Sequence, residues 1–177
     1  MHICFCFTLS YNFFVLSSMC VGGGKSGEEA FHYSLWRDRL KEMNSCYGAL
    51  PVHDGLWKCA LETRDDILAR LAIVHMVLEG RGLDVEPSSI QKLVNAKDEH
   101  SANLLKTISK DEITHVGSGV RWFRYVCENQ NPPVKDPIAK FQQIVKERFR
   151  GNLKPPFNTK ARDAAGFAPE WYLPLAK

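Results

Sequence analysis

The sequence predicts an all-α protein built as a helical bundle. Apolar residues recur at steps of three and four over long segments, the spacing that places them on one face of a helix. No segment alternates apolar and polar residues over a useful length, as a half-buried strand would. Short connections marked by Gly and Pro separate the helical segments, which is typical of a bundle.

Two helices are predicted in the first half of the chain. Residues 28–44 carry apolar side chains at helical spacing and lead into a loop, residues 44–55, marked by Gly and Pro. A long helix is expected over about residues 63–96. Pro87 should kink or break that helix near Glu86, because proline lacks an N–H and crowds the preceding turn.

Two more helices and a C-terminal arm follow. Asp98 is placed to cap a helix that extends to about Glu128, where two consecutive prolines follow shortly afterwards. A shorter helix is expected over roughly residues 137–150. The remainder, residues 151–177, is interrupted by prolines and predicts an extended arm lying over a surface. Its predicted anchors are Phe157, Phe167, Trp171 and Tyr172.

Residues 1–27 are predicted as an atypical hydrophobic segment, and residues 28–177 as the helical domain. Polar residues interrupt residues 1–20 too often for a membrane span of roughly 20 apolar residues. No Lys or Arg precedes Lys25, as a signal peptide would require. We therefore expect a cytoplasmic protein without a membrane span, with secretion or membrane association through residues 1–20 as the alternative.

Charge and cysteine usage exclude some classes of protein. The net charge is +3 and the basic residues are dispersed, so the sequence gives no argument for a nucleic-acid surface. The six cysteines form no CxxC pair. Their irregular spacing favours reduced thiols in an intracellular protein over a disulfide framework.

Each of three stripes predicted to face the core contains a glutamate and a histidine. A buried carboxylate is costly unless it is paired or bound to a metal, and no Lys or Arg occupies these positions. A pair of metal ions would supply the positive charge, and would accept both carboxylate oxygen and neutral imidazole nitrogen. The stripes are Glu29, His32, Trp36, Leu40 and Met43; Leu68, Ala72, His75, Glu79 and Gly82; and Leu104, Ile108, Glu112, His115, Gly119 and Trp122.

The motif Glu-x-x-His occurs twice on these stripes, at Glu29–His32 and at Glu112–His115. Residues three apart lie on the same side of a helix, so each pair suits one metal ion. A single copy carries little information, since it also occurs on solvated faces. Two copies, with Glu79 on the intervening helix, favour a metal centre. His75 is predicted to be a core histidine or a hydrogen-bonding partner of a metal ligand, with direct ligation as the alternative.

A resemblance to a known family rests on five ordered motifs: "EEAFHYSLWRDRL", "YGALPVHDGLW", "LARLAIVHMVLEGRGLDV", "DEITHVGSGVRWF" and "LKPPFNTKARDAAGFAPEWYLPL". Over about residues 27–177 the chain resembles the ferritin-like family called domain of unknown function 455, which is more distantly similar to di-iron tRNA hydroxylases and rubrerythrins. The resemblance implies a ferritin-like bundle with a di-iron centre, manganese being the alternative metal. The ligands that it implies are Glu29, His32, Glu79, Glu112 and His115.

The chain departs from this family at its N-terminus. The resemblance implies an opening helix that supplies one more glutamate, but residues 1–27 contain no Glu or Asp. We therefore expect a bundle that is truncated at its N-terminus and has an incomplete site. Residues 3–20 are the candidate for a substitute hydrophobic helix, because Phe5, Leu9 and Phe13 recur at helical spacing.

Two functions are compatible with these expectations. The first is an oxidase or hydroxylase that uses dioxygen on a small-molecule or unknown substrate. A tRNA substrate is suggested only by analogy with the distant relatives, and the net charge does not support it. The second is a non-catalytic bundle with an incomplete metal site, in which an uncovered apolar face would favour a homodimer. Iron storage is a third option, but nothing in the sequence indicates a shell-forming oligomer.

Overall fold

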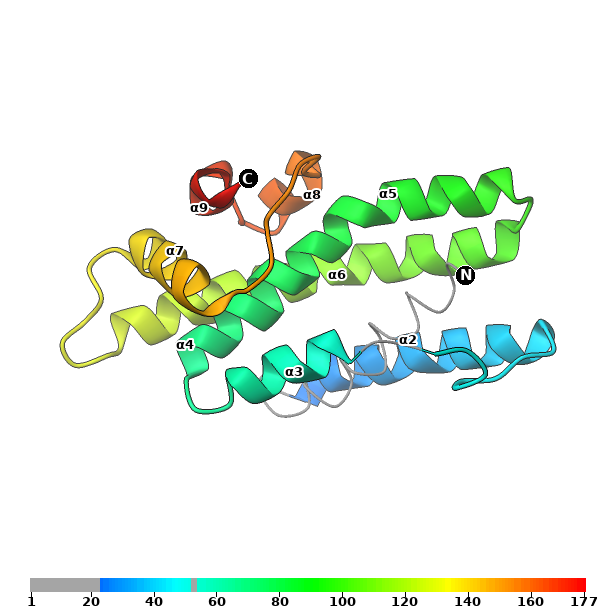
Figure 1. The fold of residues 1–177 in the computed structure, drawn as a ribbon, viewed down its shortest axis with the longest axis horizontal. Helices are drawn as coiled ribbons and strands as arrows, with labels where there is room; N and C mark the ends of the chain where they lie inside the picture. The colour runs from blue at the N-terminus through cyan, green and yellow to red at the C-terminus, as the bar shows by residue number, and fades with distance from the viewer. Residues whose placement is uncertain (1–22, 52–53) are drawn as a thin grey trace. The chain divides into compact units, whose positions relative to one another are not determined.

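The all-α prediction is confirmed over the residues that the computed structural model describes, 23–51 and 54–177. These residues contain no named strand, and Leu153 and Ala176 form an isolated β-bridge. The expectations for residues 1–20, including a substitute helix over 3–20, lie outside the described residues. The elements (Figure 1) are α2 (Gly23–Glu42), α3 (Gly55–Glu62), α4 (Ile67–Arg70), the π-helix η1 (Leu71–Leu78), α5 (Glu79–Asn95), α6 (Glu99–Glu128), α7 (Pro137–Arg148), α8 (Thr159–Ala164), α9 (Pro169–Tyr172) and the 3₁₀ helix η2 (Leu173–Leu175).

The chain forms two compact units, which are described separately. The first comprises residues up to Lys58 together with Ser88–Ile108, and the second comprises Cys59–Pro87 together with Ser109–Lys177. Helices α5 and α6 each contribute residues to both units. The predicted boundary at residue 27 stays a prediction.

In the first unit, α2 packs against the end of α5 and the beginning of α6. Asp98 caps α6 as predicted, because its Oδ1 accepts a hydrogen bond from the Ser101 backbone N–H at 3.0 Å. Arg39 of α2 donates to the same Asp98 Oδ1 at 3.0 Å and to Ser101 Oγ at 2.9 Å. These bonds attach α2 to the start of α6. The core of the unit consists of Trp36, Leu40, Leu93, Ala102, Leu105 and Ile108.

In the second unit, the aromatic residues of the C-terminal arm complete the core. Phe167, Trp171 and Tyr172 are fully buried, as their predicted role as anchors requires, and Phe157 is partly buried. The arm differs from its predicted extended form, since it contains α8 and α9. Asn158 explains the first of these helices, because its Oδ1 accepts a hydrogen bond from the Ala161 N–H.

Of the kink or break predicted at Pro87, the break does not occur, because α5 continues through this residue to Asn95; the kink stays a prediction. Pro87 cannot donate a hydrogen bond to the carbonyl oxygen of Leu83, one turn earlier. Asn158 donates to that oxygen instead, through Nδ2 at 3.1 Å. A side chain of the C-terminal arm therefore replaces the hydrogen bond that the proline removes.

A buried ion pair joins α8 to α5 within the second unit. Arg162 donates through Nε to Asp84 Oδ1 at 2.8 Å and through Nη2 to Asp84 Oδ2 at 2.7 Å. Both side chains are almost fully buried. The guanidinium also lies 4.3 Å from the ring centroid of Tyr172. This two-bond geometry orients the charges and compensates much of their cost of burial.

Other predicted boundaries shift by a few residues. Helix α2 begins at Gly23 rather than residue 28, and α7 ends at Arg148 rather than residue 150. The long helix predicted from residue 63 begins at Ile67, where Asp66 caps it by accepting a hydrogen bond from the Ala69 N–H. The short helix α3 was not predicted. No helix of the described residues is both long and apolar enough to cross a membrane.

Replacing Asn158 by alanine should lower the free energy of unfolding by about 1–3 kcal/mol. The substitution removes the cap of α8 and the donor to the Leu83 carbonyl oxygen together. Urea unfolding followed by circular dichroism measures the effect. Asn152→Ala is the matched control, because Asn152 is exposed in the same arm. Equal stabilities of the two variants would contradict the proposed repair of α5, in which Asn158 supplies the hydrogen bond that Pro87 removes.

Candidate metal centre

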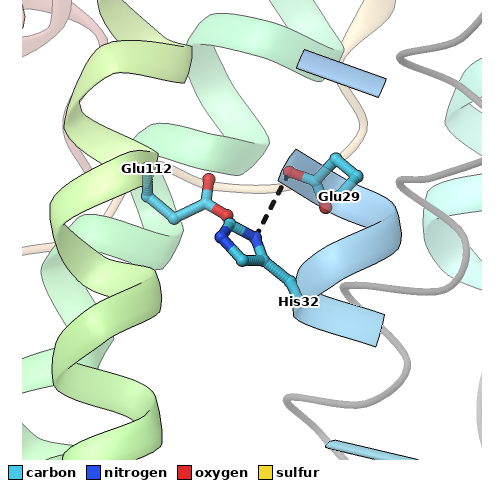
Figure 2. Close-up of side chains that lie close together, drawn as sticks. All are labelled: Glu29, His32 and Glu112. Carbon is cyan, nitrogen blue, oxygen red and sulfur yellow. Dashed lines mark ion pairs between the residues drawn. The ribbon is translucent and has the colours of Figure 1, made fainter. Parts of the chain in front are cut away.

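Glu29 and His32 lie on α2, in the first unit, and both side chains are buried. His32 Nδ1 is 3.8 Å from Glu29 Oε1, one helical turn away (Figure 2). Trp36 and Leu40 continue this stripe and are buried as predicted. Met43 does not belong to it, since it follows the end of α2 and is 45% exposed.

Glu112 and His115 form the corresponding pair on α6, in the second unit. His115 Nδ1 is 3.6 Å from Glu112 Oε2, and His115 is the more buried of the two. The predicted stripe ends at Gly119, because Trp122 is 45% exposed. Phe123 takes the buried position instead, where the rings of Phe141 and Trp171 pack against it, each with its centroid at 6.0 Å.

His75 and Glu79 lie at the junction of η1 and α5, also in the second unit. His75 Nδ1 is 2.6 Å from Glu79 Oε1, and both residues are buried. The π-helical hydrogen bonding of η1 was not predicted from the sequence, although such segments are often found at functional sites. The contact gives His75 a partner among the predicted ligands, and its role at a metal stays a prediction.

The other carboxylate oxygen of Glu79, Oε2, is buried and has no hydrogen-bond partner among the described residues. A buried carboxylate oxygen without a partner is costly, because the interior replaces none of the hydrogen bonds that water made to it. A cation bound to this oxygen would remove the cost.

Gly119 allows η1 and α6 to approach each other closely. A Cβ atom built on Gly119 would lie 2.8 Å from the Cβ of His75, closer than two carbon atoms tolerate. The absence of a side chain at Gly119 therefore lets α6 lie against η1 beside His75. His115 stands one turn before Gly119 on the same helix.

Burial and one neighbouring carboxylate disfavour ionisation of Glu79. Burial raises the pKa of its carboxyl, and the nearby Glu112 raises that pKa further. His75 and His115 act in the opposite direction. No Lys or Arg is among the charged groups that act on Glu79 in the described part of the chain. The site therefore lacks positive charge, which a metal ion would provide.

Glu86 belongs to the same region, although it was not among the residues predicted from the sequence. It lies two turns after Glu79 on α5, and its carboxylate forms a hydrogen bond with the Ser109 side chain of α6. Burial, followed by the proximity of Glu112, raises the pKa of Glu86 to about 8. The predicted stripe reaches Glu86 by one more step of four from Gly82, but the expected break at Pro87 concealed this continuation.

The second unit thus brings together four predicted residues, His75, Glu79, Glu112 and His115, and the first unit pairs Glu29 with His32. Buried carboxylates and imidazoles on the helices of an all-α fold define a candidate metal-binding protein.

The chain belongs to the family described as "Protein of unknown function (DUF455)", whose model matches residues 25–173. This confirms the family predicted from the five motifs. The chain is also 36% identical over 140 residues to an uncharacterized protein of Haemophilus influenzae. The match covers 79% of this chain and 48% of the relative, so the chain spans about half the length of that relative. No solved structure matches the chain.

Replacing Gly119 by alanine should destabilise the protein by about 1–3 kcal/mol, since the new methyl group would force α6 away from η1. Gly82→Ala is the matched control, because a Cβ at Gly82 would meet no atom within 4 Å. That variant should gain up to about 1 kcal/mol from helix propensity alone. Urea unfolding of both variants measures the difference. A stabilising Gly119→Ala would show that the close approach is not required.

The metal-free protein should lose stability as the pH rises from about 5 to about 8, in part through Glu86. Its pKa is about 8 in the folded protein against 4.5 for the free side chain. Between these values the unfolded chain releases a proton that the folded protein retains, so this contribution is present below about pH 4.5 and is lost as the pH rises through 8. The stability of Glu86→Gln relative to the wild type should therefore increase with pH. Urea unfolding in the presence of a chelator tests this, with the exposed Glu128→Gln as control.

Proposed function

We propose that this protein is a ferritin-like di-iron carboxylate protein that uses dioxygen to oxidise or hydroxylate a substrate whose class the site does not define. The observation that carries the proposal is the buried Oε2 of Glu79, which has no hydrogen-bond partner among the described residues although its carboxylate lies in a group of acids and imidazoles. A buried carboxyl group of this kind must be protonated, paired with a cationic side chain or bound to a metal ion.

The fit of a metal to these residues rests on charge and on the types of donor atom. Burial and Glu112 both disfavour the ionised form of Glu79, while two histidines offer the only opposing influence identified among the described residues. Carboxylate and imidazole together are suitable ligands for iron and also for manganese, which is the alternative metal. The absence of thiolates from the group argues against a structural zinc site, which commonly uses cysteine.

Each unit contributes one Glu-x-x-His motif to the proposal, Glu29–His32 in the first unit and Glu112–His115 in the second. The proposal assigns one ion to each motif, following the pattern of di-iron carboxylate proteins. Figure 2 shows the Glu29–His32 pair, which offers one carboxylate and one imidazole. Glu79, which also belongs to the second unit, is assigned to the ion of the Glu112–His115 motif.

Bound iron would supply the redox chemistry, in which dioxygen is reduced while a substrate is oxidised. The residues of the chain hold and surround the ions. His75 fixes one oxygen of Glu79 through its Nδ1 and so orients the carboxylate for binding through the other oxygen. Ala72, Met76 and Val116 are fully buried neighbours of these residues on η1 and α6. Their burial keeps bulk water away from this part of the site.

The protein should bind about two iron ions per chain, and His115→Ala should reduce binding more than His75→Ala. The reason is that His115 is a proposed ligand, whereas His75 only orients Glu79. Loss of an orienting partner typically lowers metal affinity by about 10–100-fold, and loss of a ligand should lower it further. Anaerobic titration with iron(II), followed by metal analysis, gives affinity and stoichiometry.

His100→Ala is the control for this experiment, because His100 is an exposed histidine on the same helix as His115. Equal losses in the two test variants would remove the distinction between ligand and orienting residue. A folded wild-type protein that binds no iron would refute the proposed function and leave the non-catalytic bundle as the interpretation.

A further inference from the structure

We infer that Glu86 is a further carboxylate ligand of the metal centre. This inference rests on the proposed function and extends it to a residue that the family resemblance does not implicate. The five proposed ligands are one carboxylate short of the usual set, two Glu-x-x-His motifs and two single glutamates. Glu86 lies in the second unit, beside the residues that need it.

Helical register places Glu86 on the same side of α5 as Glu79. The two residues are seven positions apart, which is two turns of an α-helix. On α6, Ser109 and Glu112 are three positions apart and so share one face. The hydrogen bond between the Glu86 carboxylate and the Ser109 side chain joins these two faces. Glu86 is therefore held against the helix that carries the Glu112–His115 motif.

Glu112 links the acidic groups of the two helices. The negative charge of Glu112 raises the pKa of Glu79, and it also raises the pKa of Glu86. Three carboxylates thus lie along one seam between α5 and α6, within the second unit. Among the described residues, no Lys or Arg contributes to the pKa shift of Glu79 or of Glu86.

A second observation points from this seam to a cation. Glu79 is 4% exposed, and its Oε2 has no hydrogen-bond partner among the described residues. This oxygen belongs to the Glu79 carboxylate, whose pKa is raised by the charge of Glu112. It is therefore part of the cluster formed by Glu79, Glu86 and Glu112. The contrast with Asp84, which is also buried on α5, is informative. Asp84 forms a two-bond ion pair with Arg162, and so needs no metal.

The test compares the wild type with Glu86→Gln, which keeps the shape of the side chain and removes its charge. Anaerobic titration with iron(II) should give about two ions for the wild type, and for the variant one ion, with the second bound at least about tenfold more weakly. The rise in melting temperature on adding iron(II) should also be smaller in the variant. Without iron, the variant should melt no lower than the wild type, because it removes a carboxyl group whose ionisation burial and Glu112 disfavour. Glu128→Gln, at an exposed position on α6, is the control and should behave as the wild type.

Two further variants keep the result interpretable. Glu86→Asp retains the carboxylate and should bind the second ion more tightly than Glu86→Gln does. Ser109→Ala retains Glu86 but frees its carboxylate, and should weaken the second ion by a smaller factor; it replaces Glu86→Gln as the test if that variant does not fold. Identical iron binding by the wild type and Glu86→Gln would overturn the role of Glu86 and leave the proposed function intact. A wild type that binds no iron would overturn both.

Discussion

The close approach of α6 to η1 at Gly119 sets the spacing of the acidic and imidazole side chains in the second unit. With the Cβ of His75 on one side and no side chain on the other, the helices exclude water from the residues nearby. Dehydration is what raises the pKa of Glu79. The same packing that stabilises the unit therefore makes the ionised carboxylate unfavourable, unless it is protonated or bound to a cation.

Helix α5 shows two solutions to the burial of acidic groups, separated by about one turn. Asp84 faces Arg162, whose guanidinium matches both carboxylate oxygens and also lies over the ring of Tyr172. Glu79 faces histidines, which are neutral or cationic according to conditions and which also bind metals. Arg162, which is always charged, pairs with Asp84, where the ion pair joins α8 to α5. Among the described residues, the charged groups that act on Glu79 are imidazoles and a carboxylate, which can also bind a metal ion.

Much of the fold could be predicted from the sequence, because steps of three and four mark the buried face of each long helix. The same steps located His75, Glu79, Glu112 and His115 in the second unit. Glu86 was missed for a physical reason: Pro87 normally ends a helix, and its repair by Asn158 depends on a residue remote in sequence.

Three other features were also beyond sequence reasoning. The π-helical hydrogen bonding of η1 has no compositional signature, since its residues are an ordinary apolar run. The exposure of Trp122 depends on which side of α6 is covered by α7 and the arm, and this is decided by Phe141 and Trp171 packing on Phe123. The short helices α8 and α9 require contacts that only the folded unit provides, because isolated helices of this length are not stable.

The repair of α5 by Asn158 has a consequence for the order in which the protein is synthesised. Asn158 and Arg162 satisfy the Leu83 carbonyl oxygen and the Asp84 carboxylate, and they follow these residues by 75 and 78 positions. A nascent chain emerging from the ribosome therefore carries an incomplete α5 until residues 158 and 162 have been synthesised. The helix that bears Glu79 and Glu86 reaches its final hydrogen bonding only after that point. Any metal ion that this helix helps to hold is accordingly expected to bind after residues 158–162 have folded onto α5, rather than as α5 itself emerges.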